Sequence, residues 1–244
     1  MEIYLNRIDG WDDAIISMFL SKRTLTRELE CKIREEVNMC TQLLFGYDRP
    51  LGSIIAMTDN LNDWLRKLFK WCPKHITMGR FLDFSFTVYG LHRAGQDDLD
   101  SHAKRMENRI IRSSTRLADF SQGEMSSFYE GKVIPTDVAL AVLGIVVPDE
   151  LEYNGQTYVK GVNGYILKGM EDNKDVKRGL YMLSIPSNFI FKINLTEFAH
   201  VFKERNQKGT ANQEVKDCIE SATDQLVEAS LGFIDRPLLM AIKN

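Results

Sequence analysis

Arg205 lies in line with a stripe of apolar residues, which makes its guanidinium group a candidate for binding an anionic ligand. Between Asn194 and Arg205, the residues Phe198, Val201, Phe202 and Arg205 follow one another at i, i+3, i+4 and i+7. This spacing places them on one face of a short amphipathic helix. Because burying an unpaired cation is costly, the arginine must reach solvent, pair with a carboxylate or meet an anionic ligand. The first two outcomes are the commoner ones for such an arginine.

A second basic element lies between Asp97 and Leu117. Its pattern predicts a helix with one apolar and one basic stripe, the latter formed by His102, Arg105, Arg109, Arg112 and Arg116. Arginines suit planar, two-point recognition of anions, although a solvated helix face explains the stripe equally well. The net charge of the chain is -3, so the basic patch is local. This argues against general nucleic-acid binding and favours a small phosphorylated ligand.

The composition is that of an ordinary globular chain, with 244 residues of which 44% are hydrophobic and 27% charged. No Pro-rich or Gly/Ser-rich linker divides it, so we expect one domain over residues 1–244. Neither a signal-peptide pattern nor an apolar run of about 20 residues occurs. We therefore expect a cytoplasmic protein with no membrane partner.

The cysteines and the short motifs provide no further chemistry. Cys31, Cys40, Cys72 and Cys218 are scattered without metal-ligand spacing, which makes a zinc site unlikely and favours reduced, partly buried thiols. Cys72 is a weak candidate nucleophile. Neither a Rossmann or P-loop glycine pattern nor a serine-hydrolase or zincin motif is present.

The order of elements predicts an α+β fold, with a central mixed or antiparallel sheet flanked by helices. Helices are expected at 11–20, at 24–44 with Thr24 or Thr26 as cap, and around 170–181. Another helix is expected to begin after a cap at Asp59 or Asn60 and to end before Pro73. The last helix is expected to begin at Thr210, whose hydroxyl would form a capping box with Gln213. Strands are expected at 84–88 and 188–193, and a hairpin turn at 153–156. The apolar run 138–147 fits either a helix or a strand.

A set of short motifs along residues 60–220 resembles the flavin-dependent thymidylate synthases. In chain order they are His75-Ile76-Thr77 before the Phe84–Val88 strand, Arg93-Ala94, His102, Asn108, Ser114-Thr115-Arg116, Asp175, Arg178, Asn194, Arg205 and Ala211-Asn212-Gln213-Glu214. The chain departs from the family at four places. The first is that it lacks the proline of the family's Val-Leu-Pro-like strand. The family's Arg-His-Arg segment becomes Ser101-His102-Ala103, its Ser-x-Arg-Tyr becomes the displaced Ser114-Thr115-Arg116-Leu117, and Asn212 stands where the family has glutamine. Lys104, Arg105 and Arg109 are the candidates to restore the lost charge.

The resemblance implies transfer of a one-carbon unit from methylenetetrahydrofolate to C5 of dUMP, with FAD as cofactor and NADPH as reductant. It places His75, Thr77, His102 and Asn194 on the flavin. It places Ser114, Arg116, Arg178 and Arg205 on the pyrimidine nucleotide, with Arg205 as the catalytic group that polarises the uracil. It also implies a homotetramer.

Simpler explanations exist for several of these residues and for the whole chain. His75 is also suited to cap a strand, Arg178 to pair with Asp175, and Asn194 to cap a helix. The chain is alternatively a diverged relative that binds or modifies another pyrimidine nucleotide. A third hypothesis is an α-helical interaction protein whose arginine face binds an acidic partner. Under the first hypothesis, Arg205→Ala is expected to abolish nucleotide binding with little loss of folding stability.

Overall fold

The computed structural model describes residues 1–41, 49–102, 109–113, 125–181, 183–206 and 212–242, and only the backbone of residues 101, 102, 109, 174, 175, 178 and 206. In chain order its elements are β1 (Glu2–Asp9), α1 (Trp11–Ser21), α2 (Arg27–Cys40), α3 (Asp59–Trp71), η1 (Ile76–Phe81), β2 (Asp83–His92), α4 (Arg93–His102), β3 (Arg109–Arg112), η2 (Ser127–Tyr129), α5 (Thr136–Val142), β4 (Glu150–Tyr153), β5 (Gln156–Gly161), β6 (Gly164–Leu167), α6 (Lys174–Lys177), η3 (Arg178–Leu180), β7 (Pro186–Asn194), α7 (Leu195–Asn206), α8 (Gln213–Ala229) and α9 (Arg236–Ala241).

Side-chain caps and buried apolar stripes define the first helices. Thr26 caps α2 by accepting from the Leu29 amide at 3.2 Å, as one of the two expected caps. The cap of α3 is Thr58, one residue before the expected Asp59, and it accepts from the Leu61 amide at 3.1 Å. The apolar face of α3 is buried as its spacing predicts.

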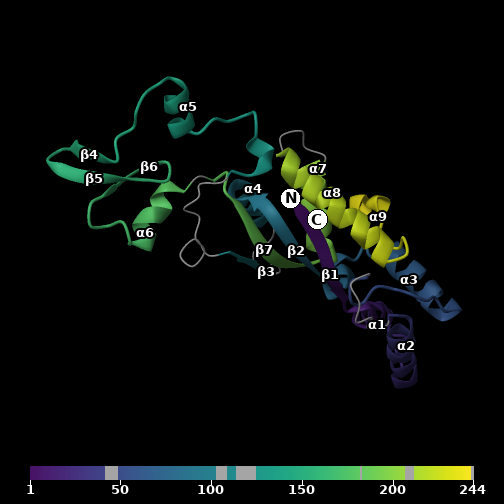
Figure 1. Cartoon of the computed structure of the whole chain (residues 1–244). Helices are drawn as coiled ribbons and strands as arrows, with labels where there is room; N and C mark the ends of the chain where they lie inside the picture. Colours follow the sequence, from purple (N-terminus) through teal and green to yellow (C-terminus); the bar gives the residue numbers. More distant parts are fainter. Residues whose placement is uncertain (42–48, 103–108, 114–124, 182, 207–211, 243–244) are drawn as a thin grey trace. The chain divides into compact units, whose positions relative to one another are not determined.

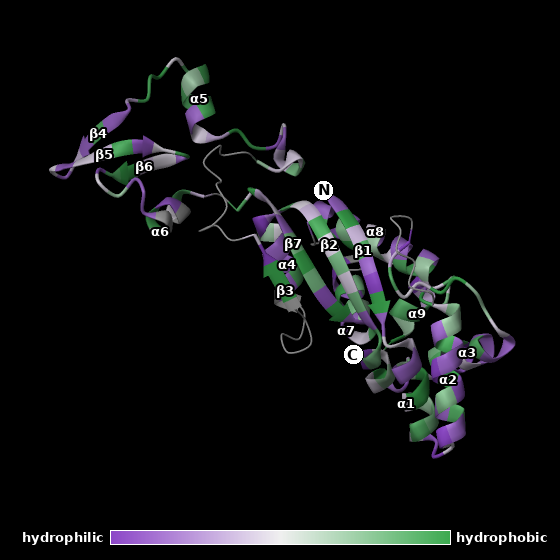
Figure 2. Cartoon of the chain, turned by 60° about the horizontal axis from the view of Figure 1, so that its bottom comes forward, coloured by the Kyte–Doolittle hydropathy of each residue, from purple (hydrophilic) through white to green (hydrophobic). Residues whose placement is uncertain are grey.

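The main sheet has four strands in the order β1-β2-β7-β3. Figure 2 shows apolar and polar residues alternating along these strands, as expected for a sheet with one face against a core. On β7, Phe189, Phe191 and Ile193 are buried. The Phe86 ring of β2 stacks on Phe191 at 5.0 Å and on Phe198 of α7 at 5.9 Å, so aromatic side chains join the sheet to its helix layer.

Helices cover the sheet on the side where this core lies. Helix α8 packs on β1, and α7 packs on α8, α9 and η1 (Figure 1). The expected α+β fold with a helix-flanked central sheet is confirmed. A second, three-stranded antiparallel sheet has the order β4-β5-β6.

By its internal contacts the chain divides into two compact units. Unit 1 comprises Met1–Val88, Asp97–Ile111 and Phe189–Asn244, and unit 2 comprises Tyr89–Gln96 and Arg112–Asn188. The expected single domain stays a prediction.

The helix expected between Asp97 and Leu117 is wrong. Helix α4 ends at His102, and Arg109–Arg112 form strand β3 beside β7. The Ser113 amide donates to the Asn188 carbonyl at 2.9 Å, which continues the pairing. The β-branched Ile110 and Ile111 suit a strand, and pairing with β7 overrides the helical period. Because Arg109–Arg112 are in a strand, these residues do not continue the basic helix stripe that the sequence predicted.

Two other expected helices differ from the structure, whereas the expected hairpin turn agrees with it. Helix α8 begins at Gln213 with Asn212 as cap, not at Thr210, and α9 is a further helix after it. Thr210 lies outside the described residues. The helix expected at 170–181 is reduced to the short α6 and η3. The hairpin turn is confirmed, with positive φ angles of 50° at Asn154 and 72° at Gly155.

Candidate functional site

Helix α7 carries two of the expected site residues at opposite ends. Asn194 precedes its first residue and Arg205 is its last but one. At about 1.5 Å rise per residue, the two positions lie about 16 Å apart along the helix axis. The site residues of unit 1 therefore form two groups, one at each end of α7.

Arg205 is buried, with 6% of its surface exposed, and it is held by Asp98 of α4. Its Nη2 donates to the backbone carbonyl of Asp98, and its Nη1 lies 3.8 Å from the Asp98 carboxylate. Burial lowers the pKa of the guanidinium, while the negative charges of Asp98 and Glu204 act in the opposite direction. The carboxylate pairing that the sequence left open as an alternative is thus present.

One donor of Arg205 stays unused within the part of the chain that the structure describes. Its Nε is buried and has no hydrogen-bond partner there. A buried donor without an acceptor costs free energy, and a ligand oxygen placed at Nε would recover that cost. The ion pair with Asp98 therefore does not use the full donor capacity of the arginine.

His102 lies close to this group along α4. It follows Asp98 by four residues in the same helix, which places the two positions on one face. The His102 side chain lies outside the described residues, as do Ser114 and Arg116 entirely and the Arg178 side chain, although Arg178 opens η3 in unit 2. The proposed pairing of Arg178 with Asp175 lies outside them as well.

The segment His75–Thr77 lies at the other end of α7. The Thr196 hydroxyl, in the first turn of α7, donates to the Ile76 carbonyl at 2.8 Å. Both His75 and Thr77 are exposed, and the His75 ring stacks on Trp71 with centroids 5.4 Å apart. The structure therefore brings His75 and Thr77 beside the start of the helix that Asn194 precedes.

Asn194 is the N-cap of α7. It is buried, and its side-chain oxygen accepts from the Glu197 amide at 3.0 Å. This confirms the structural explanation that the sequence offered for this residue. A cap explains the burial of its amide, and an additional contact with a flavin stays a prediction.

A glycine allows η1 to lie close to the chain before α1. Gly10 has a φ of 85°, and a Cβ at this position would run into the backbone carbonyl of Phe81. Only glycine adopts this conformation without strain and permits the contact. Phe81, the last residue of η1, therefore lies against the junction of β1 and α1.

Sequence reasoning missed several polar residues that make long-range contacts. Asp98, which is partly exposed, was assigned only to the first turn of a helix, since nothing local to it indicates a partner 107 residues away. In unit 2, His92 is fully buried between the rings of Phe128 at 5.5 Å and Tyr129 at 5.0 Å. Gln96 donates to the carbonyls of Leu91 and Ser187 at 2.8 and 3.0 Å. No periodicity predicts such long-range contacts.

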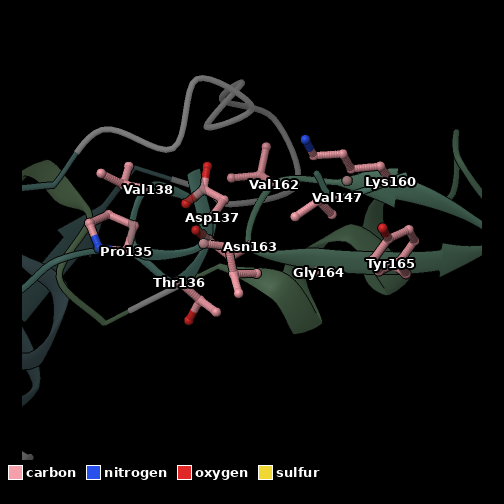
Figure 3. A pocket seen from close by; sticks show the side chains of 12 residues that line it. Pro135, Thr136, Asp137, Val138, Val147, Lys160, Val162, Asn163, Gly164 and Tyr165 are labelled. Carbon is pink, nitrogen blue, oxygen red and sulfur yellow. The ribbon is translucent and has the colours of Figure 1, made fainter. Parts of the chain in front are cut away.

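Unit 2 contains two hollows formed by the β5–β6 hairpin. The first, of about 400 Å³, lies between this hairpin and α5, with Lys160 and Tyr165 at one end and Pro135 and Val138 at the other (Figure 3). The second, of about 330 Å³, is lined by Leu180 and Tyr181 among others. Among the described residues, those that line these two hollows include none of the expected site residues.

Neither a protein-family model nor a curated protein matches the sequence. Solved structures do match it. Thymidylate synthase X (ThyX) from Helicobacter pylori, with FAD and dUMP, is 14% identical, covers 98% of this chain and 100% of its own, and has a TM-score of 0.52. A second match is a UMP/dUMP methylase, PolB from Streptomyces cacaoi, bound with 5-Br dUMP. It is 10% identical, covers 95% of this chain and 92% of its own, and has a TM-score of 0.53.

The chain has the fold of the flavin-dependent thymidylate synthases. The resemblance seen in the sequence is therefore confirmed at the level of fold. The thymidylate synthase-like fold spans nearly all of this chain and of the matched chain, so both units belong to the matched region.

Within this thymidylate synthase-like fold, two of the buried cysteines, Cys72 and Cys218, are poor nucleophiles. Burial raises the pKa of the Cys72 thiol to about 12, and that of Cys218 to about 12 as well. Among the described residues, no His, Cys, Asp and Glu side chains gather into a group of three that would bind a metal. Helices long and apolar enough to cross a bilayer are likewise absent from the described part of the chain.

Proposed function

We propose that this protein methylates C5 of dUMP, or of a related pyrimidine nucleotide, with methylenetetrahydrofolate as one-carbon donor, FAD as cofactor and NADPH as reductant. The observation that carries this proposal is the fold match over 98% of the chain to an enzyme solved with FAD and dUMP. The ordered motifs from His75 to Glu214 support it independently, because the fold comparison does not depend on them.

The residues around His75 fit a flavin dinucleotide. His75 and Trp71 present a stacked pair of exposed rings, and the Lys22 ammonium lies 4.5 Å above the Trp71 ring. Aromatic faces suit a planar heterocycle, and the cation suits a diphosphate. In this assignment His75, Thr77, Asn194 and His102 hold the flavin, which supplies the hydride when bound.

Arg205 is the proposed catalytic residue, and its geometry fits a uracil carbonyl. The Asp98 carboxylate lies 3.8 Å from Nη1, and the Nε–H has no partner in the described part of the chain, so Nε–H is suited to donate to a carbonyl oxygen. A donor fixed in advance stabilises the charge that develops on that oxygen during attack at C5. We assign the phosphate and sugar to Ser114, Arg116 and Arg178.

A catalytically diverged relative is the alternative, in which the protein binds or modifies another pyrimidine nucleotide. Two observations favour it. The family's Arg-His-Arg becomes Ser101-His102-Ala103 at the end of α4, and Arg109 lies on a strand instead of extending that helix. The second is that one of the matched structures is described as a UMP/dUMP methylase.

The test measures cofactor and reaction separately. The purified protein is expected to show a flavin spectrum, or to acquire one on addition of FAD at tens of micromolar. With folate and reductant it is expected to release tritium from C5-tritiated dUMP. A protein that takes up no flavin would contradict the proposal, and flavin uptake without release from dUMP or UMP would favour the diverged relative. We also propose that the protein is a homotetramer, as the family resemblance implies.

A further inference from the structure

An apolar surface lies on unit 2, along helix α5 and the loop that follows it. Six large aliphatic side chains are exposed there by 46 to 90%: Ile134, Val138, Val142, Leu143, Ile145 and Val146. We call them the 134–146 surface. The segment 138–147 contains no charged or polar side chain, and Val142 and Val146 are exposed by 80% and 90%.

The extent of this surface is unusual for a protein surface exposed to water. Single exposed aliphatic residues need no explanation, but contiguous apolar patches rarely exceed a few hundred Å² on monomeric proteins. In a standard-size interface each partner buries roughly 800 Å², of which somewhat more than half is apolar. The exposed apolar area of these six side chains together approaches that apolar part. The 134–146 surface therefore has the size and composition of one half of an interface.

The charges around the surface limit what covers it. Asp137 lies just before the apolar segment 138–147, and Asp149, Glu150 and Glu152 follow that segment closely. Carboxylates repel nucleic acid and anionic lipid headgroups. An uninterrupted apolar segment is typical of permanent association between identical chains, whose interfaces are more hydrophobic than those of transient complexes.

We propose that the 134–146 surface packs against a second copy of this chain, forming one of the interfaces of the assembly. A two-fold arrangement places the same surface on both sides, so the apolar area of each protomer covers that of its partner. This rests on the self-association proposed above and specifies where one contact lies. It does not depend on which nucleotide the protein methylates.

The test compares two variants of the full chain by sedimentation equilibrium at micromolar concentration. V142E/V146E places two carboxylates on the 134–146 surface of each protomer. L20E/M39E is the matched control, because Leu20 in α1 and Met39 in α2 are also exposed apolar residues, at 59% and 58%. All four positions are exposed in the single chain, so both variants are expected to fold.

The wild type is expected to sediment as an oligomer, and V142E/V146E as a smaller species whose self-association is weakened by at least about 100-fold. The control should match the wild type. An oligomeric wild type whose mass V142E/V146E leaves unchanged would overturn the proposed surface but not self-association. A monomeric wild type would overturn both, and flavin uptake and tritium release still test the reaction independently. Wild-type binding to phosphatidylcholine vesicles that V142E/V146E abolishes would assign the surface to a membrane and overturn the proposal.

Discussion

Arg205 is held by Asp98, a residue 107 positions earlier in the chain, through both the backbone and the side chain of the aspartate. The Nη2 donor meets the Asp98 carbonyl, Nη1 lies 3.8 Å from the carboxylate, and Nε has no partner in the described part of the chain. The guanidinium is therefore fixed on one side and available on the other. This arrangement orients a donor for a ligand and limits the net charge that the ligand meets.

Arg205→Ala is expected to lower the affinity for dUMP by at least about 10-fold, because the proposed carbonyl donor is lost. The structure also revises the expectation of little stability loss. Removing a buried, hydrogen-bonded side chain should lower the free energy of unfolding by about 1 to 3 kcal/mol. Equilibrium binding and urea unfolding measure the two effects.

Two further variants serve as comparisons for Arg205→Ala. Arg205→Lys should restore little affinity, since an ammonium group does not reproduce the planar fork. Arg236→Ala removes an exposed arginine that is paired with Glu220 and Asp224, and it should leave dUMP binding unchanged. Normal dUMP binding by Arg205→Ala would show that the site assignment is wrong.

Asp98→Asn is expected to raise the affinity for dUMP relative to deoxyuridine by about three- to tenfold at low salt, because one negative charge near the site is removed. The backbone carbonyl of residue 98 still accepts from Arg205, so the arginine stays in place. Calorimetric titration with both ligands at low and high salt measures the difference. Asp97→Asn, at an exposed position of the same helix turn, is the control. A fall in affinity for both ligands would instead mean that the carboxylate positions the arginine.

Two substitutions of Asn194 distinguish its role as the cap of α7 from a role in flavin binding. Asn194→Ala should destabilise the protein by about 1 kcal/mol through loss of the cap of α7, and Asn194→Asp should recover most of it. If Asn194 also contacts the flavin, the aspartate variant should still bind FAD more weakly, because it lacks the amide N–H₂ donor. Thermal unfolding and FAD titration give the two readouts. Wild-type FAD affinity in Asn194→Asp would leave Asn194 with the cap alone.

The buried thiols predict a loss of stability at alkaline pH. The pKa of Cys218 is raised from 9.0 to about 12 in the folded protein, so above pH 9 the unfolded chain releases a proton that the folded chain keeps. The stabilisation is complete below pH 9 and is lost as the pH rises to about 12. By pH 11 the loss is about 2 to 3 kcal/mol for this thiol.

Denaturant unfolding between pH 8 and pH 11 measures this effect. Cys218→Ala should show a smaller decline than the wild type, while Cys31→Ala should not, because Cys31 is exposed. An identical decline in Cys218→Ala and the wild type would contradict the assignment of the shift to Cys218.

Local patterns were enough to predict much of the framework. The apolar spacing of α3, the alternation in β2 and the Asn154-Gly155 turn each depend on contacts between residues near one another in the chain, and each was found as expected. The amphipathic helix carrying Arg205 was found for the same reason. A resemblance in the order of short motifs indicated the fold, which the solved structures confirm.

The sequence by itself determined the periodic elements, the turn and the identity of the cation on α7, because these follow from backbone geometry and side-chain spacing. Only the tertiary structure decided that Arg109–Arg112 is a strand, since its hydrogen bonds come from β7 and outweigh a helical period. It alone decided that Asp98 is the partner of Arg205 and that Nε is left to donate, because contacts between distant residues depend on how the elements pack.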